Sequence, residues 1–379
     1  MDNKAGFDLL VVGAGIVGLG VALAAVRKGK KVVVVERNAK AIGASIRNFG
    51  FVTVSGQKAG GHWARARRTR DIWAEIVDEA GIKVMHRGAI MLAYRREAKD
   101  VLDAFLATPM GRECRGLTPA EAFEHVPALR TEGALGALYS PHEMRVESNE
   151  AVAKLANWLA HKHGVVFQWS TAVNSIYGDR IETSRGTLRA KATIVCPGDD
   201  FTTLFPECIG PYALKVCTLQ MLRLELAQPV RFGAAVMSDL SIGRFDGFAD
   251  LPGAHALTAR LDKELPEMRA AGVHLIAVQS SDGSLIVGDS HVYGNTAEPF
   301  AQERIDNLII KAFDTFLTYR AALLRRAGRA VTPRRATVLR WWIGRRTISE
   351  SLSSLGALVP PLALHSARKL FPNFSIETI

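Results

Sequence analysis

The sequence feature that most constrains the fold is a glycine-rich turn near the N-terminus, between an apolar strand and a helix. Residues 8–18 read DLLVVGAGIVG, an apolar run that ends in a G-x-G-x-x-G motif. The pattern that follows predicts a helix over 19–28 and a second strand over 31–35, which ends on Glu36. This order of elements, within about 30 residues, is typical of a dinucleotide-binding unit.

Each residue of this motif has a physical task in such a unit. Gly13 permits the tight turn, Gly15 lets the backbone approach a pyrophosphate, and Gly18 allows close packing of helix on strand. The free N–H groups at the start of the helix favour phosphate. Glu36 can accept hydrogen bonds from the ribose hydroxyls. For the glycines alone, an apolar core that binds nothing is the alternative interpretation.

A membrane anchor is a second alternative, because residues 7–26 are almost all apolar. Asp8 and five glycines interrupt or flank this run, however, and a strand with charged ends follows it. No basic segment or small-residue cleavage pattern fits a secretion leader. We therefore expect no membrane span.

Composition predicts a soluble globular chain. The 379 residues are 48% hydrophobic and 22% charged, which is enough for a large core and two domains. The cysteines lack C-x-x-C spacing and predict reduced core thiols in a cytoplasmic protein: Cys114, Cys196, Cys208 and Cys217. His161 and His163, two apart at a predicted helix end, face different directions, so we expect no metal site.

Hydrophobic periodicity outlines the rest of the chain. It predicts helices over 60–80, 97–107, 148–163 and 300–317. Short strand-like runs fill 165–196, where they alternate with glycine-containing turns.

The second half of the chain has longer alternating strands. Two of them, 274–279 and 284–289, are joined at Asp282-Gly283 and predict a hairpin. The second strand leads into His291 and Tyr293. Because binding groups often lie at strand ends, both side chains are candidates for substrate contact.

These features together resemble the FAD-dependent amine oxidase superfamily of D-amino-acid oxidase, glycine oxidase and sarcosine oxidase. The likeness covers residues 1–319 and includes the N-terminal unit, GAS followed by RN, the mid-chain strands and the antiparallel insertion. Four segments resemble a subgroup associated with phosphonate breakdown, whose members oxidise N-methylated 2-aminoethylphosphonate: RNFG at 47–50, QMLR at 220–223, DGS at 282–284 and GDSH at 288–291.

The resemblance implies an α/β fold, with a Rossmann-like FAD-binding domain and an inserted α+β substrate domain built on an antiparallel sheet. Segments 1–86, 146–213 and 320–379 would form the FAD-binding domain, and 87–145 and 214–319 the substrate domain.

The resemblance also implies which residues hold FAD. Those expected at the ADP half are Gly13, Ala14, Gly15, Ile16, Val17, Gly18, Glu36 and Arg37, with the backbone of Val173 at the adenine. Those expected near the flavin or its ribityl chain are Ala44, Ser45, Arg47, Asn48 and Gly198.

The chemistry implied is hydride transfer from the carbon beside an amine nitrogen to flavin N5, followed by imine hydrolysis. The protein must supply an oriented pocket with a cationic anchor for an acidic substrate. Arg47 is the first candidate anchor, because a guanidinium matches a carboxylate or phosphonate bidentately; contact with FAD phosphates or a buried carboxylate is the alternative. Asn48, His291 and Tyr293 are further substrate candidates. A D-amino-acid or glycine-type oxidase is the alternative function, and the electron acceptor, O2 or another, stays open.

The C-terminal segment departs from the family. Residues 320–379 hold eleven basic and two acidic side chains, a net charge of +9, whereas the first 319 residues carry +2. The family needs an apolar strand and a Gly-rich loop here, but this segment has three glycines.

An out-of-frame C-terminus would explain this departure, because codons permitted for residues 351–364 also encode VVVTGGTGASTGF in another frame. We then expect helices and loose packing in this segment, and poor FAD binding or slow flavin reduction. A genuine basic tail is the alternative. It would suit an RNA-directed flavoprotein, although we expect no nucleic acid as partner, and an inactive gene product is a third interpretation.

Overall fold

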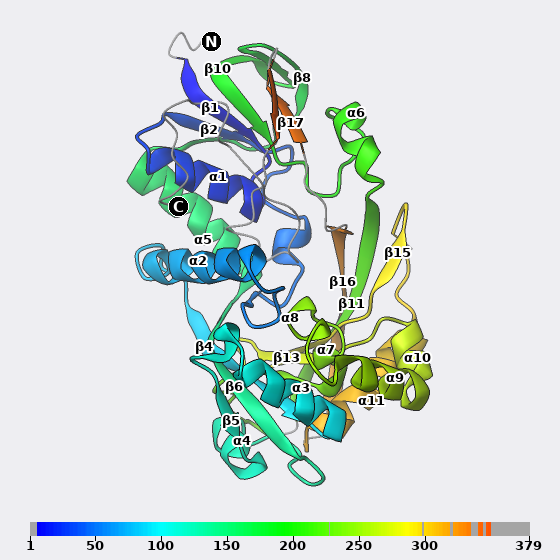
Figure 1. Ribbon diagram of the computed structural model, residues 1–379. Helices are drawn as coiled ribbons and strands as arrows, with labels where there is room; N and C mark the ends of the chain where they lie inside the picture. The colour runs from blue at the N-terminus through cyan, green and yellow to red at the C-terminus, as the bar shows by residue number, and fades with distance from the viewer. Residues whose placement is uncertain are drawn as a thin grey trace.

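The computed structural model of the chain contains two large β-sheets, one above the other, with helices packed around them (Figure 1). It describes residues 6–226, 228–297 and 299–318 in full, and beyond them only the backbone of three strands. Among the helices that it describes, none combines the length and apolar composition needed to cross a membrane. Two cysteines, Cys114 and Cys217, are buried, and all four are free thiols.

The six-stranded sheet contains the predicted dinucleotide unit. β1 lies between β2 and β10 and runs parallel to both. Leu9 and Val11 pack against the helices on one side of this sheet, whereas Leu10 packs on the other side, as the alternation of a strand requires. The order is β7-β2-β1-β10-β9-β8, with bounds β1 Phe7–Val12, β2 Val32–Val35, β7 Val166–Gln168, β8 Val173–Tyr177, β9 Arg180–Thr183 and β10 Gly186–Val195.

Three helices cover one face of this sheet and the space below it (Figure 1). They are α1 Ile16–Val26, α5 Ser148–His163 and α2 Gly61–Ile76. α5 ends at Gly164, whose φ of +66° lies in the left-handed region that favours glycine. The predicted helices at 60–80 and 148–163 are thereby confirmed, while α1 begins three residues before the predicted helix at 19–28.

The ten-stranded sheet is the predicted antiparallel platform. Its order is β15-β11-β14-β13-β12-β4-β6-β3, with β16 paired to β11 and β5 paired to β6. The bounds are β3 Phe51–Val52, β4 Val84–Ala93, β5 Arg115–Leu117, β6 Gly136–Val146, β11 Lys215–Leu226, β12 Ala235–Met237, β13 Ile276–Gln279, β14 Leu285–Gly288, β15 Val292–Gly294 and β16 Ala321–Arg334. β13 and β14 form the predicted hairpin.

Helices on this sheet enclose the larger hydrophobic core. α11 presents an apolar stripe that includes Ile305, Ile309 and Phe313. The predicted helices at 97–107 and 300–317 are confirmed as α3 and α11. The bounds are α3 Arg96–Leu106, α4 Pro119–His125, α7 Asp239–Ile242, α8 Asp246–Ala249, α9 Ala254–Glu264, α10 Pro266–Ala270 and α11 Glu303–Phe316; elsewhere lie α6 Pro206–Ile209 and the 3-10 turns η1 Ala44–Ile46, η2 Pro109–Gly111 and η3 Gly210–Tyr212.

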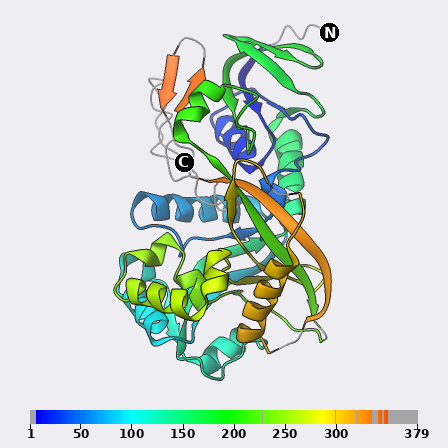
Figure 2. The same ribbon diagram turned by 90° about the vertical axis from the view of Figure 1, so that its right-hand side faces the viewer.

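The start of the C-terminal segment corrects one expectation. Where helices were predicted, β16 is a strand that pairs antiparallel with β11 from Lys215 to Leu226 (Figure 2). β17 Arg340–Ile343 and β18 Arg346–Ser349 form a second extended pair. The expectation of helices, which followed from the out-of-frame interpretation, was wrong for residues 321–334, because the edge of β11 next to this segment accepts a strand. The proposed out-of-frame segment 351–364 lies outside the described residues, and the division into domains stays a prediction.

Candidate functional site

The turn after β1, residues 13–18, is called the cradle here. At two of its positions there is room only for a glycine. Gly13 has φ +101°, and its N–H donates to the carbonyl of Val35 at 2.8 Å. A Cβ atom on Gly13 would lie 2.5 Å from the carbonyl oxygen of Cys196. One on Gly18 would lie 1.9 Å from the carbonyl oxygen of Gly13. Neither position accepts a side chain, so the N-terminus of α1 can lie directly against the turn.

The short turn η1 closes the cradle from a second side. The Oγ of Ser45 accepts a hydrogen bond from the N–H of Ile16 at 3.0 Å, and both residues are buried. A Cβ atom on Gly15 would lie 3.1 Å from this Oγ, so a larger residue there would press on η1. Ala14 is buried and Val17 partly buried in the same turn. The residues expected at the pyrophosphate are therefore brought together.

Glu36, at the end of β2, is held in place by two neighbours. One carboxylate oxygen accepts from the N–H of Ala14 at 2.9 Å. The other accepts from the backbone and side-chain N–H groups of Asn38, each at 3.0 Å. A carboxylate offers about four acceptor positions, so this side chain still has capacity for a ribose hydroxyl.

Arg37 and Val173, expected at the ADP half, and Gly198, expected near the flavin or its ribityl chain, lie around the same edge of the sheet. Arg37 forms an ion pair with Asp200 at 2.7 Å, which ties it to the loop that contains Gly198. Gly198 has φ +66° and open space where a side chain would be. Val173 is buried at the start of β8. Only Nη1 of Arg37 donates to Asp200, and its half-exposed guanidinium has further N–H donors that can reach a phosphate.

These features fit the ADP half of FAD. The cradle supports this fit most directly. A Cβ atom at Gly13 or at Gly18 would clash with a backbone oxygen that could not move away. The sheet edge supplies an acidic hydrogen-bond acceptor at Glu36. The start of α1 supplies backbone N–H groups that have no acceptor within the helix.

Asn48 and Arg47, which follow η1, have different surroundings. The side-chain amide of Asn48 donates to the carbonyls of Ala44 at 2.8 Å and Ser45 at 3.1 Å, and accepts from the N–H of Gly50 at 2.7 Å. Asn48 therefore fixes the turn, and its amide is already engaged. Arg47 is exposed; its backbone N–H donates to the carbonyl of Ala44 at 3.2 Å, whereas its guanidinium forms no hydrogen bond or ion pair with the described residues.

His291 and Tyr293 lie together at the edge of the ten-stranded sheet. The ring of His291 is buried, 5.0 Å from the ring of His274 and 6.5 Å from that of Tyr293. Tyr293, 46% exposed, lines a pocket together with Gln220 and Ser290. Among the described contacts, none joins this pair to Arg47 or Asn48, so the four substrate candidates do not form one cluster here.

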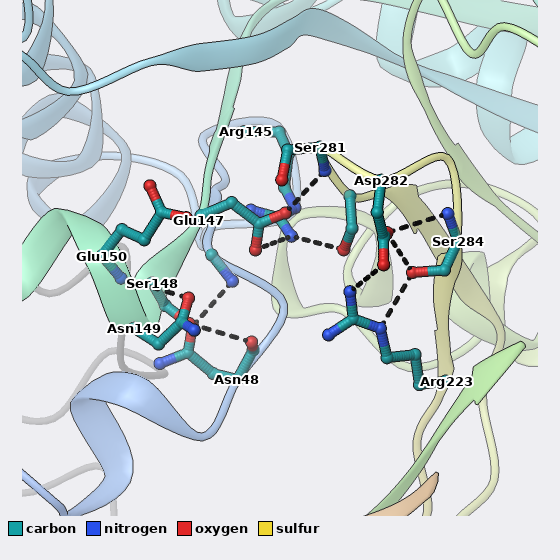
Figure 3. Close-up of polar contacts among 12 residues, drawn as sticks. Asn48, Arg145, Glu147, Ser148, Asn149, Glu150, Arg223, Ser281, Asp282 and Ser284 are labelled. Atoms are coloured by element: carbon teal, nitrogen blue, oxygen red, sulfur yellow. Dashed lines mark hydrogen bonds and ion pairs between the residues drawn. The ribbon is translucent and has the colours of Figure 1, made fainter. Parts of the chain in front are cut away.

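Sequence analysis missed a buried arginine next to Gly50. Arg145, 1% exposed, donates to Glu147 at 3.1 Å, while its Nε and Nη1 have no partner in the described part of the chain. Burial lowers the pKa of this guanidinium. Glu147 also accepts from the N–H of Ser281, at the tip of the β13–β14 hairpin, at 3.0 Å (Figure 3). Only a glycine fits at position 50, because its φ is +61° and a Cβ atom there would lie 1.8 Å from the carbonyl oxygen of Val146, as well as 2.8 Å from Nη1 of this arginine.

The same hairpin holds a second arginine. Arg223 on β11 donates to Asp282 at 2.7 Å and to the hydroxyl of Ser284 at 2.9 Å (Figure 3). Hydrogen bonds from Ser284, together with Arg223, hold the pKa of Asp282 below its usual value. The QMLR and DGS segments singled out in the sequence are thus in contact. These two motifs marked Arg223 and Asp282 in the sequence. No motif marks Arg145, which lies in a strand whose partners are far away in the sequence.

Comparison with known proteins identifies the family. Its model, described as DAO, FAD dependent oxidoreductase, matches residues 8–371. Similar solved structures include glycine oxidase from Geobacillus kaustophilus, with TM-score 0.68, 17% identity and coverage of 94% of this chain and 92% of that one. L-proline dehydrogenase from P. horikoshii has TM-score 0.71, 17% identity and coverage of 94% and 90%.

A third similar structure has FAD bound. L-alpha-glycerophosphate oxidase from Mycoplasma pneumoniae has TM-score 0.65 and 13% identity, and the match covers 87% of this chain and 84% of that one. The comparison with curated proteins found no match. With the cradle in place and the family model matched along nearly the whole chain, this protein belongs to the DAO family of FAD-dependent oxidoreductases.

Proposed function

We propose that the protein oxidises a small amine that carries an acidic group, with N-methylated 2-aminoethylphosphonate as the substrate to test first. When bound, FAD supplies the hydride acceptor for oxidation of the carbon–nitrogen bond, and water then hydrolyses the imine product. The four family-like segments in the sequence support the phosphonate substrate. The chain's own residues must bind and orient the acidic end of the amine.

The observation that carries this proposal is the state of Arg47. Its exposed guanidinium follows η1 by one residue, and η1 is fixed to the start of α1 through Ser45. No carboxylate among the described residues neutralises it. The backbone of Arg47 is thus fixed next to the cradle, and its guanidinium carries a charge that no described carboxylate balances. Such a group suits a phosphonate or carboxylate, which it can hold through two parallel hydrogen bonds.

Anaerobic mixing with candidate amines tests the proposal. We expect the visible absorbance of the flavin to bleach with N-methyl-2-aminoethylphosphonate, and the same amine without an acidic group to bleach it far more slowly. Bleaching by no acidic amine would contradict the proposal.

Arg47→Lys tests the anchor, because it replaces a planar fork by a point charge. We expect KM for the anionic amine to rise about tenfold or more while flavin content stays constant. Equal loss of flavin and activity would instead make Arg47 a cofactor ligand.

A glycine-type or D-amino-acid oxidase is the second candidate. The fold of the glycine oxidases and of L-proline dehydrogenase favours it, since those proteins by name act on amino acids. The same bleaching experiment separates the two, because this candidate predicts faster reduction by glycine or D-alanine than by the aminophosphonate.

Three sequence expectations remain proposals alongside this function. They are the cytoplasmic location, the out-of-frame C-terminus and the absence of a nucleic-acid partner. Sequencing the coding DNA around residues 320–379 tests the second directly. A single intact reading frame together with normal flavin reduction would contradict it. Salt-dependent affinity for RNA would contradict the third.

A further inference from the structure

We propose that His274, Asp289 and His291 form a binding site for a divalent first-row transition-metal cation such as Zn²⁺. The Nδ1 of His274 lies 3.2 Å from Oδ1 of Asp289, and the Nδ1 of His291 lies 3.9 Å from the same oxygen. Each residue offers one ligand atom, and these three atoms lie within 4.8 Å of one another. The proposal does not depend on the amine substrate.

The separations match those of a coordination sphere. Bonds from zinc to imidazole nitrogen or carboxylate oxygen are about 2.0–2.1 Å long. Two ligand atoms at a tetrahedral angle are then about 3.3 Å apart. The observed 3.2 Å and 3.9 Å lie on either side of this value, and the separation of the two imidazole nitrogens is at most 4.8 Å, so metal binding needs only a small movement of the ligands.

The position of the three residues also suits a metal ion. His274 comes two residues before β13, Asp289 directly follows β14, and His291 directly precedes β15. All three are buried, with 4%, 3% and 7% of their surfaces exposed. Because an ion needs little space and much of its charge is balanced by the carboxylate, a buried mixed cluster of this kind can hold it without a large cavity.

The chemistry of the donors selects the class of ion. Two imidazoles and one carboxylate suit zinc and neighbouring transition metals better than Ca²⁺ or Mg²⁺, which prefer oxygen ligands. Three protein ligands leave a further coordination position for water.

An existing contact of His291 competes with metal binding. Nδ1 of His291 lies 3.2 Å from the carbonyl oxygen of Gly272. Metal binding through Nδ1 therefore requires the tautomer with its proton on Nε2, and loss of the bond to Gly272.

Metal titration of the full-length protein tests the site. After treatment with a chelator, the protein is incubated with Zn²⁺, passed through a desalting column and analysed for zinc by mass spectrometry. We expect one zinc ion per chain. With Co²⁺ in place of zinc, we expect the visible absorption bands of a low-coordinate site, a readout that does not involve the flavin.

Matched variants assign the metal to these residues. Asp289→Asn and His274→Gln should each weaken zinc binding about tenfold or more, whereas His161→Gln, at the exposed end of α5, should leave it unchanged. Melting curves without metal show whether each variant folds, and His291→Gln replaces any variant that does not. Wild-type protein that retains no zinc, or equal zinc in all variants, would overturn the proposal and leave Asp289 as a partner that only orients the two imidazoles.

Discussion

At the scale of single residues, Glu36 links the structure of the cradle to its binding role. Its carboxylate binds the N–H of Ala14, inside the turn, and the amide of Asn38, outside it. The same side chain therefore shapes the turn and offers the remaining acceptor positions to a ribose. A residue with these two tasks should be sensitive even to an isosteric change.

Glu36→Gln should weaken FAD binding by roughly 5- to 150-fold. The substitution removes the charge and turns one acceptor into a donor, a loss of about 1–3 kcal/mol for a hydrogen bond at a partly buried site. The dissociation constant of FAD, measured by fluorescence with apoprotein, checks this. Glu132→Gln, an exposed change elsewhere, is the control. Equal constants for Glu36→Gln and wild type would show that this carboxylate does not meet the ribose.

Arg145, on β6, forms an ion pair with Glu147, which also accepts a hydrogen bond from Ser281 in the β13–β14 hairpin. Arg145→Met should lower the free energy of unfolding by about 3 kcal/mol, because it leaves the partly buried Glu147 without its cation. The double variant Arg145→Met/Glu147→Leu should recover most of that loss. Urea unfolding measures both, with Arg47→Met expected within about 0.5 kcal/mol of wild type. A double variant as unstable as the single one would contradict the pairing.

At the scale of elements, β4 and β6 place a buried histidine opposite a buried arginine. His86 on β4 stands opposite Arg145 on β6. Burial, and then the charge of Arg145, lower the pKa of His86 from 6.5 to about 3. The folded protein therefore holds this imidazole neutral, whereas the unfolded chain protonates it near its ordinary pKa.

The sign of this effect predicts an acid-sensitive fold. The contribution of His86 to stability is fully present above pH 6.5 and is lost as the pH falls from 6.5 towards 3. Between pH 7 and pH 4 we expect the wild type to lose about 3 kcal/mol more than His86→Gln. Urea midpoints at both pH values measure the difference, with His161→Gln as control. Equal losses in wild type and His86→Gln would show that His86 titrates normally.

The elements also show which parts of the fold can be predicted from sequence periodicity. The predicted helices and the β13–β14 hairpin are set by neighbours in the sequence, through a repeating apolar stripe or a two-residue turn, and they were predicted correctly. The pairing of β16 with β11 joins segments about 100 residues apart. Nothing local specifies such a pair, and the expectation of helices there followed from the out-of-frame interpretation of the segment.

At the scale of the whole molecule, the fold explains which site residues could be predicted. The cradle is local: Gly13, Gly18 and Glu36 lie within one strand–helix–strand unit, so their spacing alone predicted the site. Three features depend on sheet pairing: the contact between Arg223 and Asp282, the burial of Arg145, and the meeting of His274 with His291. Residues of this kind have no characteristic spacing in the sequence, and only the folded chain brings them together.

The central claim is that the N-terminal cradle holds FAD, and Gly15→Val tests it most directly. A Cβ atom at Gly15 would lie 3.1 Å from Ser45 Oγ, and the two methyl groups of valine would occupy the approach to the turn. Gly6→Val is the control, because Gly6 is exposed, its φ lies outside the left-handed region and a Cβ atom there meets nothing within 4 Å.

The measurement is the ratio of flavin to protein in each purified variant, read from visible absorbance. We predict flavin in the wild type and in Gly6→Val, and almost none in a folded Gly15→Val. A Gly15→Val protein with its full complement of flavin would contradict the cradle as the FAD site.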